Sequence, residues 1–373
     1  MSAPGTGTPS APVLTAVELV RVRLPLRHAH RAAHGSEAVR DLVLVRAGFD
    51  DGTSGWGECS ALARPTYTSE HTAGAWLVLR DEIVPAVFAG RAPQVVGHPM
   101  ASAAVLTALS DAVLQRVERS LATDLAEAHG TNPVRAVQTC AVISRSDGLD
   151  DVLARVDERV AARVAMVKLK VTPDPQDLAA VGAVREAWPD LALAVDFNGT
   201  ADADALHQLA PLHLEYVEQP APADELVRSA HLASLIEAPV ALDESLTSPG
   251  ALDTAVALGA GRIANIKPAR CGGPHAGAAL VAQARNAGLE VFVGGMVESG
   301  VGRAAALAVA ALPGCTLPTD LGPSLAYFDE DVTEPLLTDG SGRMIVPMAP
   351  GIGVVPHADR VDRFAVDRLV IER

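Results

Sequence analysis

The chain has 373 residues, of which 49% are hydrophobic and 20% are charged, enough for a barrel of roughly 200 to 250 residues plus a second, smaller unit. Its formal net charge of −15, from 30 Lys and Arg against 45 Asp and Glu, opposes phosphate backbones and anionic lipid surfaces, so no nucleic acid and no membrane is expected as a partner. The four cysteines form no CxxC pair, which excludes structural zinc and a disulfide framework and indicates a reducing compartment.

Residues 1–12 are rich in Ser, Ala, Pro, Gly and Thr and lack the basic and apolar regions of an export signal, so they predict a disordered tail. The longest aliphatic run, at 304–312, is shorter than the about 20 apolar residues that span a bilayer. These features predict a soluble, cytoplasmic protein.

Residues 13–132 are predicted to form an α+β capping domain. Extended segments are expected at 16–24, 41–49 and 55–59, in the order of an antiparallel meander. Helical periodicity follows at 69–87 and 100–129.

From residue 133 to 328 strand-like and helix-like segments alternate, which predicts an α/β fold with a (β/α)8-type barrel. Eight strands are expected, at 136–143, 165–171, 191–197, 214–218, 240–243, 263–267, 289–293 and 315–317. Residues 329–373 end in an extended stretch at 363–371. This stretch is predicted to return to the meander as a further strand.

Five of these strands end on charged residues that lie 22 to 26 residues apart, about one βα unit. They are Lys168 with Lys170, Asp196, Glu218, Asp243 and Lys267. Because the strand ends of a parallel barrel meet at one face, these side chains are expected around a common centre. The two lysines on either side of Leu169 should point to the same side of their strand.

The three acids offer hard oxygen ligands, which favours Mg²⁺ first and Mn²⁺ second. For any one acid alone, a structural ion pair at the barrel rim is an equally good interpretation. A lysine that acts as a general base needs a pKa of about 7 to 8 instead of about 10.4. The charge of Lys168 is expected to lower the pKa of Lys170, and the charge of Arg270 that of Lys267. Arg270 could also be a surface Arg that pairs with an anion.

This layout suits removal of the proton α to a substrate carboxylate, with a lysine taking the proton and the cation offsetting the charge of the enediolate. Lysines on opposite faces of the substrate permit either inversion of the centre or loss of a β leaving group. The residues leave both outcomes open.

The motifs VKLKV, DFN, EQP, LDES and NIKPARCGG around these charged residues resemble the enolase superfamily, in its muconate-lactonizing subgroup. The similarity covers nearly the whole chain. PTYTSE at 65–70, GGMVESGVGRA from Gly294 and TDLGPSLAYFDEDVTEP from Thr319 are most similar to the o-succinylbenzoate synthase and N-succinylamino acid racemase branch.

The resemblance implies a Mg²⁺-dependent racemase or a lyase (dehydratase) that acts on a small-molecule carboxylate substrate and forms a homo-oligomer. It implies Lys170 and Lys267 as the acid/base pair, with Lys168 in support, and it makes the three acids the metal ligands. The other implied site residues are Asn198, Tyr67, Gly294, Gly295 and Met296 near the substrate, with Arg270 and Glu244 in support. A loop at 27–35 and the loop around Tyr67 would form a lid.

Two departures from the branch affect its usual succinyl substrate: the first barrel strand reads TCAVIS, and Phe197 stands between Asp196 and Asn198. A dipeptide epimerase, a cycloisomerase and a non-catalytic binding protein of the same fold are the alternatives. His28, His30 and His34 suggest either a metal cluster or a His-rich lid, and the lid is the preferred interpretation.

Overall fold

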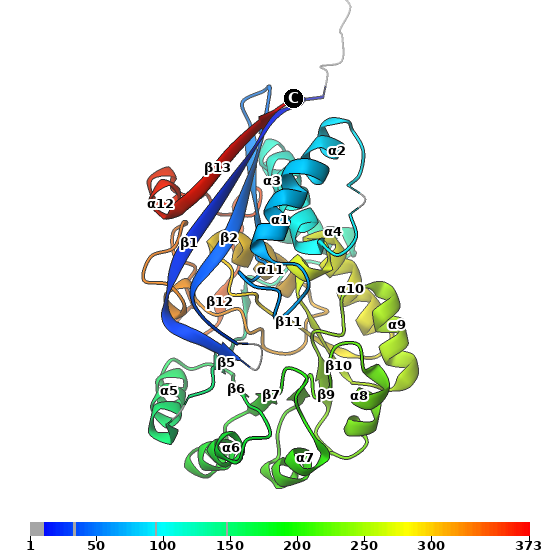
Figure 1. The fold of residues 1–373 in the computed structure, drawn as a ribbon, viewed down its shortest axis with the longest axis vertical. Coiled ribbons are helices and arrows are strands. Elements are labelled where there is room, and N and C mark those ends of the chain that lie inside the picture. The colour runs from blue at the N-terminus through cyan, green and yellow to red at the C-terminus, as the bar shows by residue number, and fades with distance from the viewer. Residues whose placement is uncertain (1–10, 33–34, 94, 147) are drawn as a thin grey trace, which may run out of the picture.

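In the computed structural model the chain forms an antiparallel capping sheet with its helices, and a parallel barrel below it (Figure 1). The structure describes residues 11–32, 35–93, 95–146 and 148–373. Most of the predicted disordered tail therefore lies outside the described residues. Within the described ranges, no helix is both long enough and apolar enough to cross a membrane.

The capping sheet has four strands in the order β13-β1-β2-β3. Their bounds are β1 Leu14–Ala32, β2 Gly35–Phe49, β3 Ser54–Cys59 and β13 Ala365–Glu372. Alternate residues of β1 enter different cores: Val17 and Leu19 pack against the capping helices, whereas Val20 and Val22 join the large cluster of the barrel side. The period of two thus buries both faces of the strand.

The C-terminal strand β13 pairs antiparallel with β1, with Leu369 opposite Leu19. This pairing confirms the prediction that the end of the chain returns to the N-terminal meander. Residues more than 300 positions apart in the sequence therefore lie side by side in one sheet (Figure 1).

Each of the two long helices predicted in the capping part is interrupted. The helical segments are α1 Thr72–Val78, a π-helical turn Leu79–Ile83, α2 Val84–Phe88, α3 Pro99–Arg116 and α4 Leu121–Ala128, and a further helix, α12 Ala358–Phe364, precedes β13. Glu118 has a φ of +50°, which ends α3 because a right-handed helix cannot continue through it. The hydroxyl of Ser120 then accepts a hydrogen bond from the Thr123 amide and begins α4.

The barrel has seven parallel strands in the order β5 to β11 around the sheet. They are β5 Cys140–Ile143, β6 Met166–Lys170, β7 Leu193–Asp196, β8 Val217–Glu218, β9 Val240–Leu242, β10 Ile263–Ile266 and β11 Glu290–Val293. The helices between and after them are α5 Leu149–Ala161, α6 Pro175–Ala187, α7 Ala203–Leu209, α8 Leu226–Ala233, α9 Pro249–Leu258, α10 Pro274–Asn286 and α11 Gly300–Ala310. Short 3-10 turns cover Ala210–Leu212, Pro268–Cys271 and Ser324–Ala326.

The predicted first strand, at 136–143, is two strands, because β4 Ala136–Val137 pairs with β12 Met344–Ile345 outside the barrel. The predicted eighth strand, at 315–317, is not a regular strand. The segment from 316 to 319 instead closes the barrel by donating backbone N–H groups to Val291 O on one side and to Gln138 O on the other, while Cys140 N donates to Thr319 O. The barrel prediction is confirmed, with the eighth position filled by this irregular segment.

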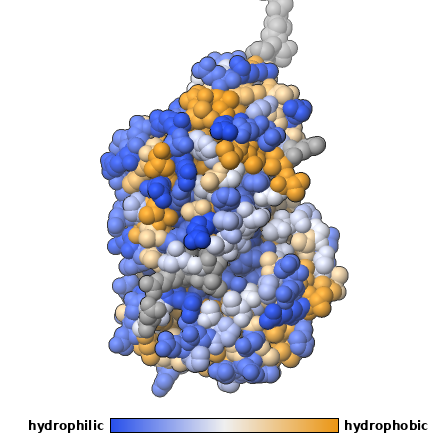
Figure 2. Space-filling view, in the orientation of Figure 1, coloured by the Kyte–Doolittle hydropathy of each residue, from blue (hydrophilic) through white to orange (hydrophobic). Residues whose placement is uncertain are grey.

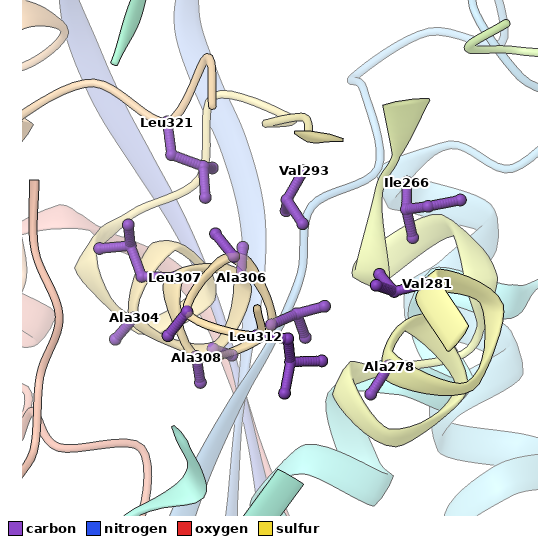
Figure 3. Packing of buried hydrophobic residues seen from close by; sticks show 14 of the residues in the cluster. Ile266, Ala278, Val281, Val293, Ala304, Ala306, Leu307, Ala308, Leu312 and Leu321 are labelled. Atoms are coloured by element: carbon purple, nitrogen blue, oxygen red, sulfur yellow. The ribbon is translucent and has the colours of Figure 1, made fainter. Parts of the chain in front are cut away.

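Helices α10 and α11 pack against the last strands through small and branched aliphatic side chains (Figure 3). Ala304, Leu307 and Ala308 of α11 and Val281 of α10 lie in one buried cluster with Val293 of β11. Removing this surface from water is the main force that holds the helices to the strands. The space-filling view shows hydrophilic residues over much of its face, with hydrophobic patches in its upper part, over the capping elements, and a smaller one at the right edge of the lower half (Figure 2).

The tip of the β1–β2 hairpin reaches down to the strand ends of the barrel (Figure 1). The prediction of a loop from 27 to 35 is therefore wrong for residues 27–32, which continue β1 and pair with β2 through Ala32 opposite Gly35. Pro25 has no N–H to donate, and the ladder passes it with a register shift between Pro25 and His30. The backbone N–H of Arg27 donates to Tyr327 O at 2.8 Å, which fastens the hairpin to the barrel.

Candidate active site

A cavity of about 180 Å³ lies where the hairpin tip meets the carboxyl ends of the barrel strands. Of the predicted site residues, the ones that line it are Tyr67, Lys168, Lys170, Asp196, Glu218, Lys267, Gly295 and Met296. The capping side contributes Leu26, His28 and Glu37. Leu26 and Met296, which are 270 positions apart in the sequence, therefore line one cavity.

Lys170, at the end of β6, is held by two oxygen acceptors. Its Nζ donates to Asp196 Oδ2 at 2.7 Å and to Asn198 Oδ1 at 2.9 Å. The register explains this contact, since Lys170 and Asp196 are partners in the β6–β7 ladder. Asn198 in turn donates its side-chain amide to Glu244 Oε1 at 2.9 Å.

Lys168 is almost fully buried and points to the same interior. Its Nζ donates to Glu218 Oε2 at 2.5 Å and to Asp320 Oδ2 at 3.1 Å. The ammonium also lies 5.1 Å from the ring centre of Phe292, which is a cation–π distance. Asn265 Nδ2 donates to the other oxygen of Glu218 at 2.7 Å, so both carboxylate oxygens are engaged.

Lys267, directly after β10, forms the opposite wall of the cavity. Its Nζ donates to Asp243 Oδ2 at 2.8 Å and to Tyr67 OH at 2.9 Å. The guanidinium of Arg270 donates to Asp243 Oδ1 at 2.8 Å and to Tyr67 OH at 2.6 Å. Arg270 is fully buried, so it is not a surface residue that pairs with an anion in solvent.

For Lys267 the structure corrects the predicted direction of the pKa shift. Burial lowers the pKa of Lys267, and the Arg270 charge lowers it too, but Asp243 and Tyr67 outweigh both and raise it well above its ordinary value. For Lys168, burial is likewise outweighed, and the nearby Glu218, Tyr216 and Asp320 raise its pKa. The nearest neighbours of both ammonium groups are carboxylates, whose attraction exceeds the repulsion from the more distant cations.

Burial also shifts the pKa values of the carboxylates in the site. Burial raises the pKa of Glu218 to about 8; Lys168 opposes this rise, and repulsion from Asp196 and Asp243 adds to it. Burial also raises the pKa of Glu244 to about 7, and its Oε2 has no hydrogen-bond partner among the described residues. Asp243 differs, because the charges of Arg270 and Lys267 outweigh burial and hold its pKa below the usual range.

The three acids provide the type of ligand that a hard divalent cation prefers, since Asp196, Glu218 and Asp243 are buried carboxylates at the ends of three adjacent strands. In the part of the chain that the structure describes, however, no three His, Cys, Asp or Glu side chains form a ready-made metal site. Their oxygens are turned toward the lysines instead. Binding of a cation would therefore require the ammonium groups to leave the carboxylates.

The remaining predicted residues divide between the cavity and the layer behind it. Gly295 and Met296 line the cavity, whereas Gly294 lies against Asn265, where an added Cβ would come within 2.2 Å of the amide oxygen. Of the three histidines, His28 lines the cavity from β1, His30 also belongs to β1, and His34 lies outside the described residues. No described metal cluster includes them.

Sequence reasoning missed several residues of the site. Asp320 accepts hydrogen bonds from Lys168 and from the Gly295 amide, and it follows the closing segment as the other acids follow their strands. Asn265 is a polar residue inside an apolar strand, two positions before Lys267 and hence on the same face. The composition gives a further signal. Only three of the 30 Lys and Arg residues are lysines, and all three line this cavity.

The chain is similar to known proteins along nearly its whole length. Residues 151–360 match the family described as enolase C-terminal domain-like. The chain is 37% identical to an N-succinylamino acid racemase from Amycolatopsis sp, covering 96% of this chain and 99% of the relative. It is 32% identical to an o-succinylbenzoate synthase from Geobacillus kaustophilus, covering 93% of this chain and 95% of the relative.

A crystal structure of an N-succinyl Arg/Lys racemase from Bacillus cereus superposes with a TM-score of 0.87 at 25% identity, covering 96% of this chain and all of that chain. The matched family covers more than half of the sequence, and the relatives align along nearly their whole length. The chain therefore belongs to the enolase superfamily.

Proposed function

We propose that this protein is an enzyme that removes the proton α to the carboxylate of a small substrate, with Lys170 and Lys267 as the acid/base pair. One observation carries the proposal: these two lysines are four strands apart in the sheet order and line the same cavity. Asp196, Glu218 and Asp243 would hold Mg²⁺ or Mn²⁺, which is also the metal chemistry of enolase-superfamily sites.

Each lysine has its Nζ oriented by two oxygen atoms, one from a carboxylate and one from Asn198 or Tyr67. In our proposal one Nζ takes the α-proton, and the other delivers a proton to the opposite face, which inverts the centre. A divalent cation bound to the carboxylates would draw their charge away from the ammonium groups and would offset the charge of the substrate enediolate. Burial of the site from water strengthens every one of these interactions.

The relatives supply the proposed substrate class, because their names describe N-succinylamino acid racemases and o-succinylbenzoate synthases. We propose racemisation of an N-succinyl or other N-acyl amino acid, with dehydration of the o-succinylbenzoate precursor as the second activity. Dipeptide epimerisation and cycloisomerisation are the alternatives within the same chemistry. A protein that binds the carboxylate without reacting with it is the remaining possibility.

The two departures from the branch have different consequences in the fold. Phe197 is fully buried in the aliphatic cluster between the strands and helices α5–α7, away from the cavity. The TCAVIS segment, in contrast, contributes Thr139, Cys140, Val142 and Ser144 to the cavity lining. Any difference in substrate from the relatives is therefore expected to come from this segment, and not from Phe197.

The proposal is tested by proton NMR of the purified protein with Mg²⁺ in D2O, with separate N-succinyl amino acids, other N-acyl amino acids, dipeptides and the o-succinylbenzoate precursor. Deuterium at the α-position, lost when EDTA is added and restored by Mg²⁺, is the expected result. Formation of o-succinylbenzoate alone would favour the synthase activity. Binding of these carboxylates without exchange or turnover would contradict the enzymatic proposal.

A further inference from the structure

The loop between β11 and α11, residues 294–299, contributes Gly295, Met296, Val297 and Glu298 to the cavity lining. Val297 has a φ of +55°. A β-branched residue pays a steric cost in this left-handed region, so it keeps the conformation only when its surroundings hold it there. On the barrel side Asp320 accepts from the Gly295 amide and Arg303 donates to Glu298 O. The capping sheet, on a different part of the chain, supplies further contacts that hold the loop.

Arg40 of β2 is one of these contacts. Its side chain is fully buried and donates Nε to Val297 O and Nη2 to Met296 O, each at 3.1 Å. The same guanidinium donates to Ser60 O at 2.8 Å and to Glu37 Oε2 at 3.1 Å. Arg40 thus joins the strained loop to Glu37, which lines the cavity from the capping side.

Glu58 of β3 holds the other end of the loop. Its Oε1 accepts from Ser299 N at 3.2 Å and its Oε2 accepts from Gly302 N at 3.1 Å, so the carboxylate sits on the first turn of α11. The Ser299 hydroxyl also donates to Glu58. Ser60 Oγ donates to Glu58 Oε1 at 2.8 Å, and since Ser60 O accepts from Arg40, the two anchors are linked.

We propose that Arg40 and Glu58 are positioning residues, which fix the loop 294–299 against the cavity and so determine how the variable part of the substrate binds. This role rests on the proposed function. Neither side chain contacts Lys170 or Lys267. Loss of either anchor should therefore weaken substrate binding and alter selectivity, while proton transfer in the bound complex continues.

The test compares Arg40→Met with Arg185→Met. Arg185 of α6 is a matched control, because its guanidinium also donates to loop carbonyl oxygens, including Leu191 O at 2.7 Å and Leu212 O at 2.9 Å, but it does not line the cavity. Backbone amide hydrogen exchange, read by mass spectrometry without substrate, should be about tenfold faster or more at 295–299 in Arg40→Met only.

Kinetics provide the second measurement. In Arg40→Met, KM for the preferred substrate should rise about tenfold or more, the order of rates among N-acyl amino acids should change, and kcat should stay within about threefold of the native value. Glu58→Gln should produce the same pattern from the other anchor, and Arg40→Lys, which keeps the charge and part of the hydrogen bonding, should restore part of the loss. Arg185→Met should change none of these quantities.

Equal amide exchange of the loop in the two arginine variants would overturn the proposal, as would a fall in kcat with unchanged KM. If the native protein exchanges no α-proton with any carboxylate, the proposed function fails, but the amide-exchange comparison still tests the anchors. Should Arg40→Met fail to fold, Arg40→Lys and Glu58→Gln must still show the faster loop exchange, and its absence in both would refute the role.

Discussion

Glu70 offers a prediction about stability that follows from one buried carboxylate. It is 1% exposed and caps helix α3, because its two oxygens accept from Met100 N and Ala101 N, each at 2.8 Å. Burial outweighs these two hydrogen bonds and raises the pKa of Glu70 from 4.5 to about 7. The folded protein therefore binds a proton at Glu70 over a range in which the unfolded chain has already lost it.

The sign follows from this difference in proton binding. A raised carboxylate pKa contributes stability that is fully present below about pH 4.5 and is lost as the pH rises through about 7. The difference between these values corresponds to about 3.4 kcal/mol, of which about 2.5 kcal/mol is lost between about pH 5 and about pH 8. Gln cannot ionise, so Glu70→Gln should be free of this loss.

The measurement is urea unfolding of the native protein and of Glu70→Gln, at several pH values between about 5 and 8. The free energy of unfolding of the variant, relative to the native protein, should increase by about 2.5 kcal/mol across this range. Glu290→Gln serves as the control, because Glu290 is exposed at the start of β11. A difference between native and Glu70→Gln that stays constant across the range would refute the reasoning, since it would mean that Glu70 is ionised throughout.

Four further predictions concern the site and its surroundings. Lys267→Ala should lower racemisation by about 10²- to 10⁴-fold, measured by polarimetry with the same α-deuterium assay, and retained racemisation would exclude the two-base assignment. Gly294→Ala should lower activity, because its Cβ would displace Asn265 from Glu218, whereas Gly250→Ala, with no atom within 4 Å of its Cβ, should not. Phe197→Ala should cost about 3 to 5 kcal/mol of stability, read by urea unfolding, with the order of preferred substrates unchanged. Protein labelled with ¹⁵N at the lysine side chains should give only three side-chain NMR signals, because the chain has three lysines. The Lys267 signal should titrate above the ordinary lysine range without metal, and it should titrate at lower pH with Mg²⁺. A Lys267 titration that Mg²⁺ leaves unchanged would count against cation binding at Asp243.

Much of the fold could be predicted from local patterns. The alternation of strand-like and helix-like segments predicted the barrel, and seven of its eight strands appear in the expected order. The boundaries were less predictable, as with the helix expected at 100–129, which is broken at Glu118 by a backbone conformation that no side-chain pattern signals. Similarly, the strand expected at 16–24 continues as β1 to Ala32, past Pro25 and a register shift between Pro25 and His30.

The charged residues at the strand ends were found from spacing alone, because the period of a βα unit brings successive strand ends to one face. Their roles as base and metal ligand stay predictions. Asp320 was missed because the strand predicted at 315–317 ended three residues before it. In the fold the closing segment extends to residue 319 through hydrogen bonds to β11 and to the residues around β5. Arg40 and Glu58 were missed for a similar reason, since they act on a loop about 240 to 260 residues away in the sequence.

The sequence by itself determined that Lys168, Lys170, Asp196, Glu218 and Lys267 share one cavity, since strand alternation and βα spacing are local properties of the chain. Only the tertiary structure decided the charge state of that cavity. The sequence placed Arg270 near Lys267 and so suggested a lowered pKa, but in the fold the nearest partners of Lys267 Nζ are Asp243 and Tyr67, at 2.8 and 2.9 Å. Because Coulomb energy falls with distance and grows with burial, contacts between residues far apart in the sequence reversed the expected shift.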